Sequence, residues 1–239
     1  MTESETLDDA FAVVGTDTNV GKTFVTAGLV GWLRELGSDA RGVKPVQSGY
    51  PPDDDAAFVA DVCGDDSAAT CPRRLGPALA PAVAADVADE TLEYETIRDE
   101  ARSLLAESNL GVLEGVGGLR VPLADGREVI DLVADLGIPA VLVARSGLGT
   151  LNHTALSVSA LRNRGITVSA IVLNHYEGET LAERTNPDVL VEMTDCPVHT
   201  LPPLDVSEPS AVVTGVREHL PPDVFPERVV SGGASLTDD

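Results

Sequence analysis

The chain has 239 residues, 43% of them hydrophobic and only 3% aromatic, which is enough apolar material for one α/β domain with an aliphatic core. Its formal net charge of −23 argues against nucleic-acid and anionic-membrane partners, and its three cysteines form no CxxC pair of a zinc site or disulfide framework. No apolar run approaches the roughly 20 residues of a membrane span, and the acidic start MTESETLDDA is the opposite of a secretory signal, so we expect a cytoplasmic protein.

The acidic residues are spread along the chain rather than gathered in a tail, with 39 Asp and Glu against 16 Lys and Arg. A surface of this kind is tolerated best where concentrated salt screens the repulsion between its charges. We therefore hypothesise a halophilic source, for which unfolding at low salt is the expected signature.

Short apolar runs alternate with longer amphipathic segments. Strands are expected at residues 11–15, 41–46, 110–114, 139–145, 168–174 and 198–201, where apolar runs end at a glycine or a polar residue. Helices are expected at residues 22–36, 92–107, 129–136, 152–164, 179–193 and 210–220, several of them followed by a glycine suited to a C-cap. Strands that alternate with helices predict a doubly wound α/β fold, with a mostly parallel sheet flanked by helices.

One domain is expected over residues 11–225, after an acidic N-terminal extension at 1–10 and before a disordered tail at 226–239. The segment 53–89 is rich in Asp, Ala and Pro, and it is the least predictable part of the chain. Fold class alone does not indicate function, so the motifs at the strand ends must carry the functional interpretation.

A glycine-bearing loop joins the first predicted strand to the first predicted helix, in the sequence VVGTDTNVGKTFVTAG. Backbone N–H groups of such a loop bind phosphate oxygens, and Gly21 lets the backbone approach them closely. Lys22 would reach the β- and γ-phosphates of ATP, and the Thr23 hydroxyl would coordinate Mg²⁺. The usual loop has a glycine where this chain has Thr16, with Gly15 one residue earlier. The strand and helix context still predicts a P-loop NTPase-like site for ATP and Mg²⁺.

The chain contains only two lysines, Lys22 in the phosphate loop and Lys44 where the second predicted strand ends. A compact ammonium differs from a planar guanidinium at a phosphate, so lysine would persist in a lysine-poor chain where arginine cannot substitute. Ligands bind at the carboxyl edge of open α/β sheets, where Lys44 is expected to lie. We expect Lys44 to hold the phosphoryl acceptor against the γ-phosphate.

Four segments together resemble the dethiobiotin synthetase family. Residues 15–23 match its loop G-T-D-T-x-V-G-K-T, with Asn19 at the variable position, and residues 44–49 match its K-P-V-x-S-G segment. Residues 113–118, LEGVGG, resemble V-E-G-x-G-G, and residues 149–153, GTLNH, resemble G-x-x-N-H at a helix start. The first two motifs are specific and the last two support them, over roughly residues 11–215.

The resemblance implies an ATP- and Mg²⁺-dependent cyclo-ligase that forms C–N bonds in biotin biosynthesis. In that reaction 7,8-diaminononanoate takes up CO2 as a carbamate, which ATP phosphorylates to a carbamic–phosphoric anhydride. The second amine expels phosphate and closes the ring, which leaves dethiobiotin, ADP and phosphate. The resemblance also implies a homodimer with its sites at the subunit interface, and catalytic roles for Lys22, Lys44, Thr18 and Ser48.

Magnesium needs hard oxygen ligands besides the phosphates, and the resemblance assigns it to Thr23, Glu114 and a second acid. Glu114 ends an apolar strand, where a buried carboxylate is costly unless it meets a cation or a metal. The second acid follows the lysine–proline segment. Asp55 fits it best, with Asp53 and Asp54 as adjacent alternatives.

The remaining contacts implied by the resemblance fall into two sets. Asn174 closes a predicted strand, and its amide, both a donor and an acceptor, would pair with the adenine edge. The helix start near residue 150 would bind the substrate carboxylate from the partner subunit. The nucleotide set comprises Thr16, Asp17, Thr18, Asn19, Val20, Gly21, Lys22, Thr23, Glu114, Gly117, Gly118, Asn174, Pro202, Pro203 and Leu204. The substrate set comprises Thr18, Lys44, Ser48, Pro81, Thr150, Leu151 and Asn152.

Two alternative functions stay open at the level of sequence. A corrinoid a,c-diamide-type amide ligase would have a similar phosphate loop, but such enzymes usually carry extra domains for which this chain leaves little room. A partner-binding switch or partitioning ATPase commonly has an additional lysine early in the loop, where this chain has Thr16, Asp17 and Thr18. A switch would also leave the segment around Lys44 unexplained.

Overall fold

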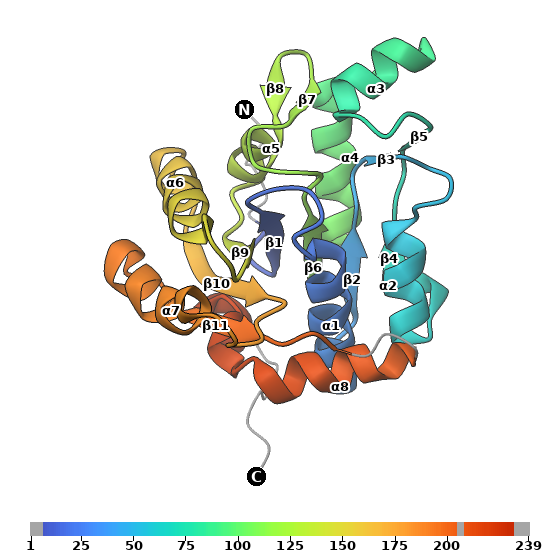
Figure 1. The fold of residues 1–239 in the computed structure, drawn as a ribbon. Helices are drawn as coiled ribbons and strands as arrows, with labels where there is room; N and C mark the ends of the chain where they lie inside the picture. The colour runs from blue at the N-terminus through green and yellow to red at the C-terminus, as the bar shows by residue number, and fades with distance from the viewer. Residues whose placement is uncertain (1–6, 205–207, 232–239) are drawn as a thin grey trace.

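The computed structural model describes residues 7–204 and 208–231. Within this part of the chain, seven strands form one sheet in the order β11-β10-β9-β1-β6-β2-β4, with every neighbouring pair parallel (Figure 1). The strands are β1 Ala10–Gly15, β2 Ala40–Val43, β4 Ala69–Thr70, β6 Leu110–Glu114, β9 Ala140–Arg145, β10 Val168–Asn174 and β11 Val198–Leu201. Two small pairs lie apart, β3 Gln47–Ser48 with β5 Arg74–Leu75 and β7 Pro122–Ala124 with β8 Arg127–Glu128. The predicted parallel sheet is confirmed.

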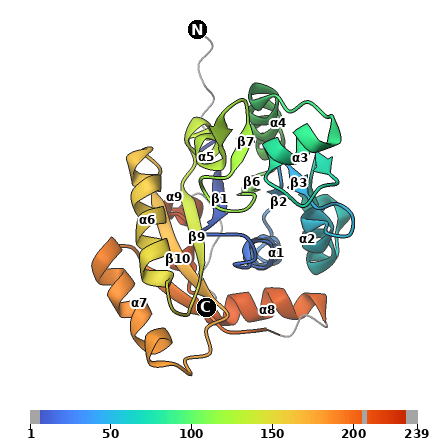
Figure 2. The same cartoon turned by 45° about the horizontal axis from the view of Figure 1, so that its top comes forward.

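Helices cover both faces of the sheet, as Figures 1 and 2 show from two directions. One face carries α1 Lys22–Glu35, α2 Asp55–Cys63, α8 Pro209–His219 and α9 Glu227–Ser231, with the 3₁₀ turns η1 Asp66–Ala68 and η2 Pro222–Val224. The opposite face carries α4 Tyr94–Ala106, α5 Val129–Leu136, α6 Thr150–Asn163 and α7 Leu181–Thr194. Helix α3 Pro81–Ala88 packs on β5 and β7. None of the helices in the described residues has the length and apolar character needed to cross a membrane.

The period-two pattern of β1 explains the two layers. Phe11 and Val13 belong to the apolar core under α1 and α8, whereas Ala12 and Val14 belong to the core under α4 to α7. All six residues of β1 are buried. The strand that leads into the phosphate loop is therefore held on both faces.

Two glycines in the middle of α1 bring this helix against α8. A Cβ built on Gly28 would lie 2.3 Å from Val216 Cγ2, and one built on Gly31 would lie 2.3 Å from Val213 Cγ2. Glycine inside a helix costs about 0.5–1 kcal/mol relative to alanine, and here the close approach of the two helices offsets that cost. The phosphate loop is thus followed by a helix that is fixed along its length.

The observed elements differ from the predicted ones where proline or a buried apolar residue intervenes. The strand expected at 41–46 ends at Val43, because Pro45 has no N–H to continue the ladder. The expected extension at 1–10 is shorter, since β1 begins at Ala10 and Leu7 packs on the core; residues 1–6 lie outside the described residues. Within the tail expected to be disordered from 226, only Glu227–Ser231 are shown to form a helix, α9, and Val229 lies in the core; residues 232–239 lie outside the described residues.

Candidate active site

Both glycines of the phosphate loop are closely packed, and the loop is hydrogen-bonded to the end of β10. Gly21 has a φ of 96°, and a Cβ added there would lie 1.9 Å from Asn174 Nδ2. The Asn174 amide donates a hydrogen bond of 3.1 Å to the Val20 carbonyl. A Cβ on Gly15 would meet Val20 Cγ2 at 2.8 Å. Only glycine fits at these two points, and the loop is clamped to the end of β10.

A cavity of about 950 Å³ opens beside this loop at the carboxyl edge of the sheet, and we call it the carboxyl-edge cavity. Its volume is in the range of small-ligand sites. Both lysines of the chain line it, as the sequence interpretation requires. Its other lining residues are Thr18, Asn19, Gly21, Thr23, Phe24, Gln47, Ser48, Pro52, Asp53, Asp54, Asp55, Phe58, Ala78, Leu79, Ala80, Pro81, Val116, Gly117 and Val121.

Lys44 is buried in a cluster of ions at the inner end of this cavity. Its ammonium lies 2.6 Å from Asp55 Oδ2 and 2.8 Å from Glu114 Oε1, and it donates to the Gly115 carbonyl at 3.2 Å. The side chains of Lys44 and Glu114 are only 5% and 2% exposed. Burial by itself lowers the pKa of Lys44, but the Glu114 and Asp55 carboxylates outweigh it, so the pKa is raised above its usual value.

Lys22 points back onto its own loop. Its ammonium donates a hydrogen bond of 2.9 Å to the Asp17 carbonyl. Burial, and then the positive charge of Lys44, lower the pKa of Lys22 to about 8. A cation at the N-terminus of a helix is unfavourable without an anion nearby, so this lysine is suited to an anionic ligand.

The predicted metal ligands meet around Lys44. The Thr23 hydroxyl donates to Glu114 Oε1 at 2.7 Å, and Asp55 reaches the same cluster through the ammonium. Two carboxylates and a hydroxyl are hard oxygen donors that fit Mg²⁺ together with phosphate oxygens. Among the described residues no group of three or more His, Cys, Asp and Glu could hold a metal by itself. The protein therefore supplies a partial ligand set that suits a metal bound with a nucleotide.

The neighbouring acids are placed differently from Asp55. Asp54 caps α2 by accepting from the Ala57 N–H, and it also pairs with Arg74 at 3.1 Å. Asp53 lines the cavity. Asp55 alone of the three contacts Lys44 and so reaches the cluster of Thr23 and Glu114.

The other predicted residues divide between the cavity and its surroundings. Thr18, Ser48, Pro81 and Gly117 line the cavity. Gly118 packs against the loop, where its Cβ would lie 3.2 Å from the Thr16 carbonyl oxygen. The backbone of Asp17 and Val20 serves as hydrogen-bond acceptor for Lys22 and Asn174, as described above.

The residues predicted at the adenine lie outside the cavity. Asn174 is buried beneath the loop, Pro202 is half-buried and Pro203 is exposed. Leu204 packs on α8, where a Cβ on Gly215 would lie 2.4 Å from Leu204 Cδ1. Their role at the base stays a prediction.

The predicted carboxylate-binding helix start also lies apart from the cavity. Thr150 is buried and its hydroxyl is 3.2 Å from that of Thr154, whereas Leu151 is half-buried and Asn152 is exposed. Helix α6 lies across the phosphate loop from α2 and α3 (Figure 1). Within one chain, these three residues therefore do not join the cavity.

Two residues near the site were missed by sequence interpretation. Gln47 is buried at the variable position of the K-P-V-x-S-G segment, and its side-chain oxygen accepts from the Asp55 N–H at 3.4 Å. Arg145 ends β9, beside β1, and donates to the Thr18 carbonyl at 3.2 Å. The position of Arg145 at a strand end before a glycine-rich stretch is a signal that could have identified it.

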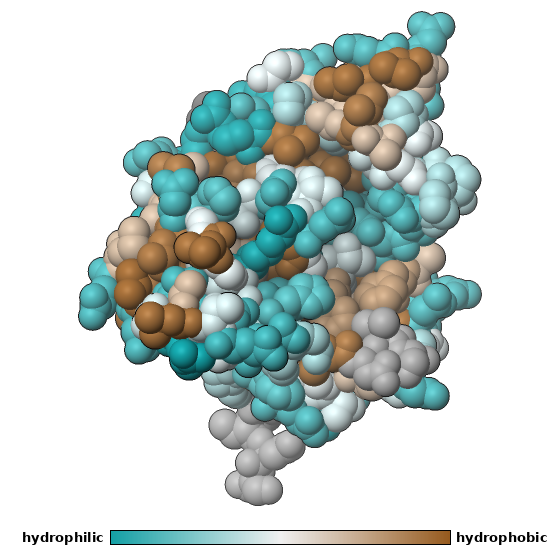
Figure 3. All heavy atoms as spheres, in the orientation of Figure 1, coloured by the Kyte–Doolittle hydropathy of each residue, from teal (hydrophilic) through white to brown (hydrophobic). Residues whose placement is uncertain are grey.

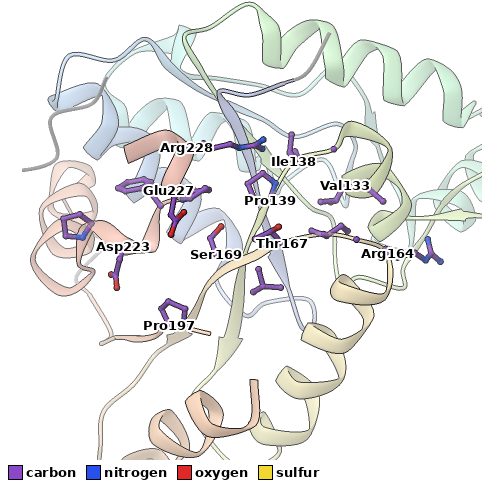
Figure 4. Close-up of a pocket in the computed structure, with 18 residues that line it drawn as sticks. Val133, Ile138, Pro139, Arg164, Thr167, Ser169, Pro197, Asp223, Glu227 and Arg228 are labelled. Carbon is purple, nitrogen blue, oxygen red and sulfur yellow. The ribbon is translucent and has the colours of Figure 1, made fainter. Parts of the chain in front are cut away.

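A second cavity of about 980 Å³ lies at the opposite edge of the sheet, and we call it the amino-edge cavity (Figure 4). Its walls come from the segments before β9, β10 and β11 and from the C-terminal part of the described chain. Ile138, Pro139, Ser169, Arg164 and Arg228 are among its lining residues. No residue predicted for catalysis or binding belongs to it.

Comparison with known proteins identifies the family of this chain. Residues 9–210 match the family described as AAA domain. The ATP-dependent dethiobiotin synthetase BioD of the haloarchaeon Haloferax mediterranei is 67% identical over 211 residues, covering 88% of this chain and 91% of the relative. The protein of the same name from Bacillus cereus is 34% identical over 218 residues, covering 88% and 90%.

Solved structures with a similar fold are more distant in sequence. The septum site-determining protein MinD complexed with Mg-ADP from Pyrococcus horikoshii aligns with a TM-score of 0.53 at 14% identity, covering 95% of this chain and 93% of that one. A ParA family ATPase from Chlorobium tepidum aligns with a TM-score of 0.56 at 13% identity, covering 93% and 96%. These two share the fold alone. Identity of 67% across nearly the whole of two chains goes further, and this chain belongs to the ATP-dependent dethiobiotin synthetase family.

Proposed function

We propose that this protein closes the ureido ring of dethiobiotin from 7,8-diaminononanoate and CO2, with conversion of ATP to ADP and phosphate. The observation that carries the proposal is the shared cavity of Lys22 and Lys44, one at the phosphate loop and the other at the end of β2. Transfer of a phosphoryl group requires the donor and acceptor to be held in line and their charges to be neutralised. Two cations that line one cavity meet both needs.

The phosphate loop would hold the nucleotide through its backbone N–H groups and the start of α1. Lys22 would leave the Asp17 carbonyl and bind the γ-phosphate, where it neutralises the charge that builds up during transfer. Lys44 would hold the carbamate oxygens. The carbamate oxygen then forms a bond to the γ-phosphorus as the bond from that phosphorus to ADP breaks.

Ring closure needs the second amine to reach the carbonyl carbon of the carbamic–phosphoric anhydride. The hydroxyls of Thr18 and Ser48 line the cavity and would orient the amine and the carbamate by hydrogen bonds. The amine forms the C–N bond, phosphate leaves with the C–O electrons, and the nitrogen releases its proton. Pro81 and its neighbours would exclude water from the apolar part of the substrate.

Thr23, Asp55 and Glu114 would hold Mg²⁺ together with the phosphates. When bound there, Mg²⁺ would neutralise charge on the β- and γ-phosphate oxygens. The adenine would lie toward Asn174 and residues 202–204, on the other side of the loop from the substrate.

A homodimer would complete the site, with Thr150, Leu151 and Asn152 of each subunit contacting the substrate carboxylate bound by the other. Large apolar side chains beside this region are exposed: Leu148 by 95%, Leu156 by 63% and Leu181 by 70%. Figure 3 shows apolar atoms gathered over α6 and α7. Exposed apolar groups of this size favour an interface.

The proposed setting is a cytoplasm with concentrated salt. The three cysteines are free thiols, which suits a reducing compartment. The Haloferax mediterranei relative supports the halophile hypothesis that the net charge of −23 suggests. A melting temperature that did not rise with KCl concentration would contradict salt adaptation.

The decisive experiment is incubation with 7,8-diaminononanoate, bicarbonate and MgATP in KCl that keeps the protein folded, followed by mass detection of dethiobiotin. The expected result is dethiobiotin formed in equal amount to ADP. Reactions without bicarbonate or without the diamine are the controls. Absence of dethiobiotin from folded protein would overturn the proposal, and hydrolysis of ATP without the diamine would favour a switch ATPase.

A further inference from the structure

Every N–H of the Lys44 ammonium is already in use. An ammonium has three hydrogen-bond donors. Its three partners here are Glu114 Oε1 at 2.8 Å, Asp55 Oδ2 at 2.6 Å and the Gly115 carbonyl at 3.2 Å. Lys44 cannot bind an oxygen of another molecule until one of these partners is released. Lys44 therefore has no free N–H with which to bind a phosphoryl acceptor.

The partners of Lys44 are also the oxygens that a divalent cation would take. Glu114 Oε1 accepts hydrogen bonds from both the Lys44 ammonium and the Thr23 hydroxyl. Asp55 forms an ion pair with Lys44. A dication bound by Thr23, Glu114 and Asp55 would lie within a few ångströms of the ammonium, where like charges repel strongly because the site is buried. Cation and ammonium cannot both keep the same carboxylate oxygens.

We propose that Lys44 and a divalent cation compete for Asp55 and Glu114, so that Lys44 is the counter-ion of these carboxylates before the cation binds and is released by it toward the acceptor. Without such a counter-ion, Glu114 would be a buried and uncompensated charge, which is strongly destabilising. Arrival of the metal with the nucleotide then frees the lysine for its substrate. This order would keep the acceptor end of the cavity inactive until the phosphoryl donor is loaded.

Asp55 is the partner that the structure makes easiest to exchange. Its side chain is 25% exposed, against 2% for Glu114. It stands at the first residue of α2, where its N–H has a long hydrogen bond of 3.4 Å to Gln47. The Gly115 carbonyl belongs to the backbone that follows β6 and stays fixed.

In the first test, nucleotide-free protein is titrated with Mg²⁺ and its affinity for Mg²⁺ is measured by calorimetry. Lys44→Met removes the competing charge and keeps the side-chain length, so its affinity for Mg²⁺ should rise about tenfold or more over that of the unmodified protein. Lys44→Arg keeps the charge and should show no such rise. Lys22→Met is the matched control, because Lys22 donates to the Asp17 carbonyl and its loss frees no carboxylate oxygen. Equal affinity in folded Lys44→Met and unmodified protein would overturn the proposal.

The second test needs no substitution at Lys44 and so avoids a variant that fails to fold. Because the chain has only two lysines, ¹⁵Nζ labelling of lysine gives two side-chain signals, and the one that Lys22→Met retains belongs to Lys44. Addition of Mg²⁺ to ADP-bound protein should shift the Lys44 signal, while ADP alone with a chelator should leave it in place. A Lys44 signal that stays unchanged at saturating Mg²⁺ and ADP would overturn the proposal.

The release of Lys44 toward a carbamate rests on the proposed function, but the competition does not. Both tests are run without diamine or bicarbonate. If the unmodified protein forms dethiobiotin but Lys44→Met binds Mg²⁺ with unchanged affinity, the proposed competition is wrong and the proposed function stands. Raised Mg²⁺ affinity together with no dethiobiotin would defeat the proposed function and leave the competition standing.

Discussion

The two cavities of this protein are nearly equal in volume, about 950 Å³ at the carboxyl edge and about 980 Å³ at the amino edge. They differ in how far their charged side chains are exposed to solvent. At the carboxyl edge the side chains of Lys44 and Glu114 are almost completely buried. At the amino edge Arg164 is 41% exposed and pairs with Asp131.

This difference indicates function better than volume does. Removal of charged groups from water is costly, and the attraction between the members of a buried pair often fails to repay it. A buried ion cluster is weak evidence for stability and a reason to look for chemistry. In the pair of Arg164 with Asp131 the cation is 41% exposed, so the pair contributes less and gives less reason to look for chemistry.

The largest effect is expected from loss of the phosphate-loop lysine. Lys22→Ala should reduce kcat by about 10³-fold or more, because charge on the transferring phosphoryl group would lose its nearest protein cation. Steady-state kinetics of dethiobiotin formation provide the measurement. Activity within tenfold of the unmodified enzyme would show that the two lysines do not share the transfer step.

Lys44→Ala should separate chemistry from nucleotide binding. We expect kcat to fall by about 10²-fold, with the KM for ATP changed by less than about threefold, because the proposed ligand of Lys44 is the acceptor and not the nucleotide. Initial rates at varied ATP and saturating diamine measure both constants. An intact kcat would remove the carbamate role, and an equal loss in kcat and ATP affinity would assign Lys44 to the nucleotide.

Local patterns predicted the phosphate loop and the strand ends at the carboxyl-edge cavity, but not α2 and α3, which also line it and lie in the segment 53–89. The phosphate loop was recognisable because strand, glycine and helix start are consecutive in sequence. The ion pair of Lys44 and Glu114 joins residues 70 positions apart, and it exists because β6 lies between β1 and β2 in the sheet. Sequence periodicity does not give strand order, so the pairing could not be predicted.

Other features were missed because their sequence signal is short or ambiguous. Helix α9 has five residues, too few to show a period, and only the burial of Val229 reveals why it forms. The hydrogen bond from the Asn174 amide to the Val20 carbonyl depends on how closely the end of β10 approaches the loop. The amino-edge cavity is bounded by connections and by the C-terminal segment, none of which carries a motif.

The packing at the two edges of the sheet can be compared at two glycines that both have positive φ. Gly21, at the carboxyl-edge cavity, has φ of 96° and Asn174 Nδ2 at 1.9 Å from an added Cβ, whereas Gly137, at the amino-edge cavity, has φ of 70° and open space. Gly137→Ala should destabilise the protein by about 1 kcal/mol through backbone strain alone. Gly21→Ala should destabilise the protein by about 1–3 kcal/mol more than Gly137→Ala does, because the new methyl group overpacks against Asn174. It should also raise the KM for ATP.

Thermal unfolding at one KCl concentration measures the stability of both variants, and initial rates at varied ATP measure the KM. Equal destabilisation by the two substitutions would mean that Asn174 yields to the new methyl group. An unchanged KM for ATP in Gly21→Ala would mean that the loop binds phosphate without its fastening to β10.

The smallest effect is expected at the amino-edge cavity. Arg164→Ala removes one of its cations and leaves Asp131 with the Glu128 N–H and, at 3.8 Å, with Arg127. Because the lost pair is partly exposed, stability should fall by no more than about 1 kcal/mol, and kcat should stay within about twofold of the unmodified enzyme. Steady-state rates and thermal unfolding of the same preparation check both values. Lys22→Ala and Arg164→Ala each delete one cation from a cavity of similar size, so they compare a cation at the phosphate loop with one outside the predicted site. A fall in kcat beyond tenfold in stable Arg164→Ala protein would mean that the amino edge takes part in turnover.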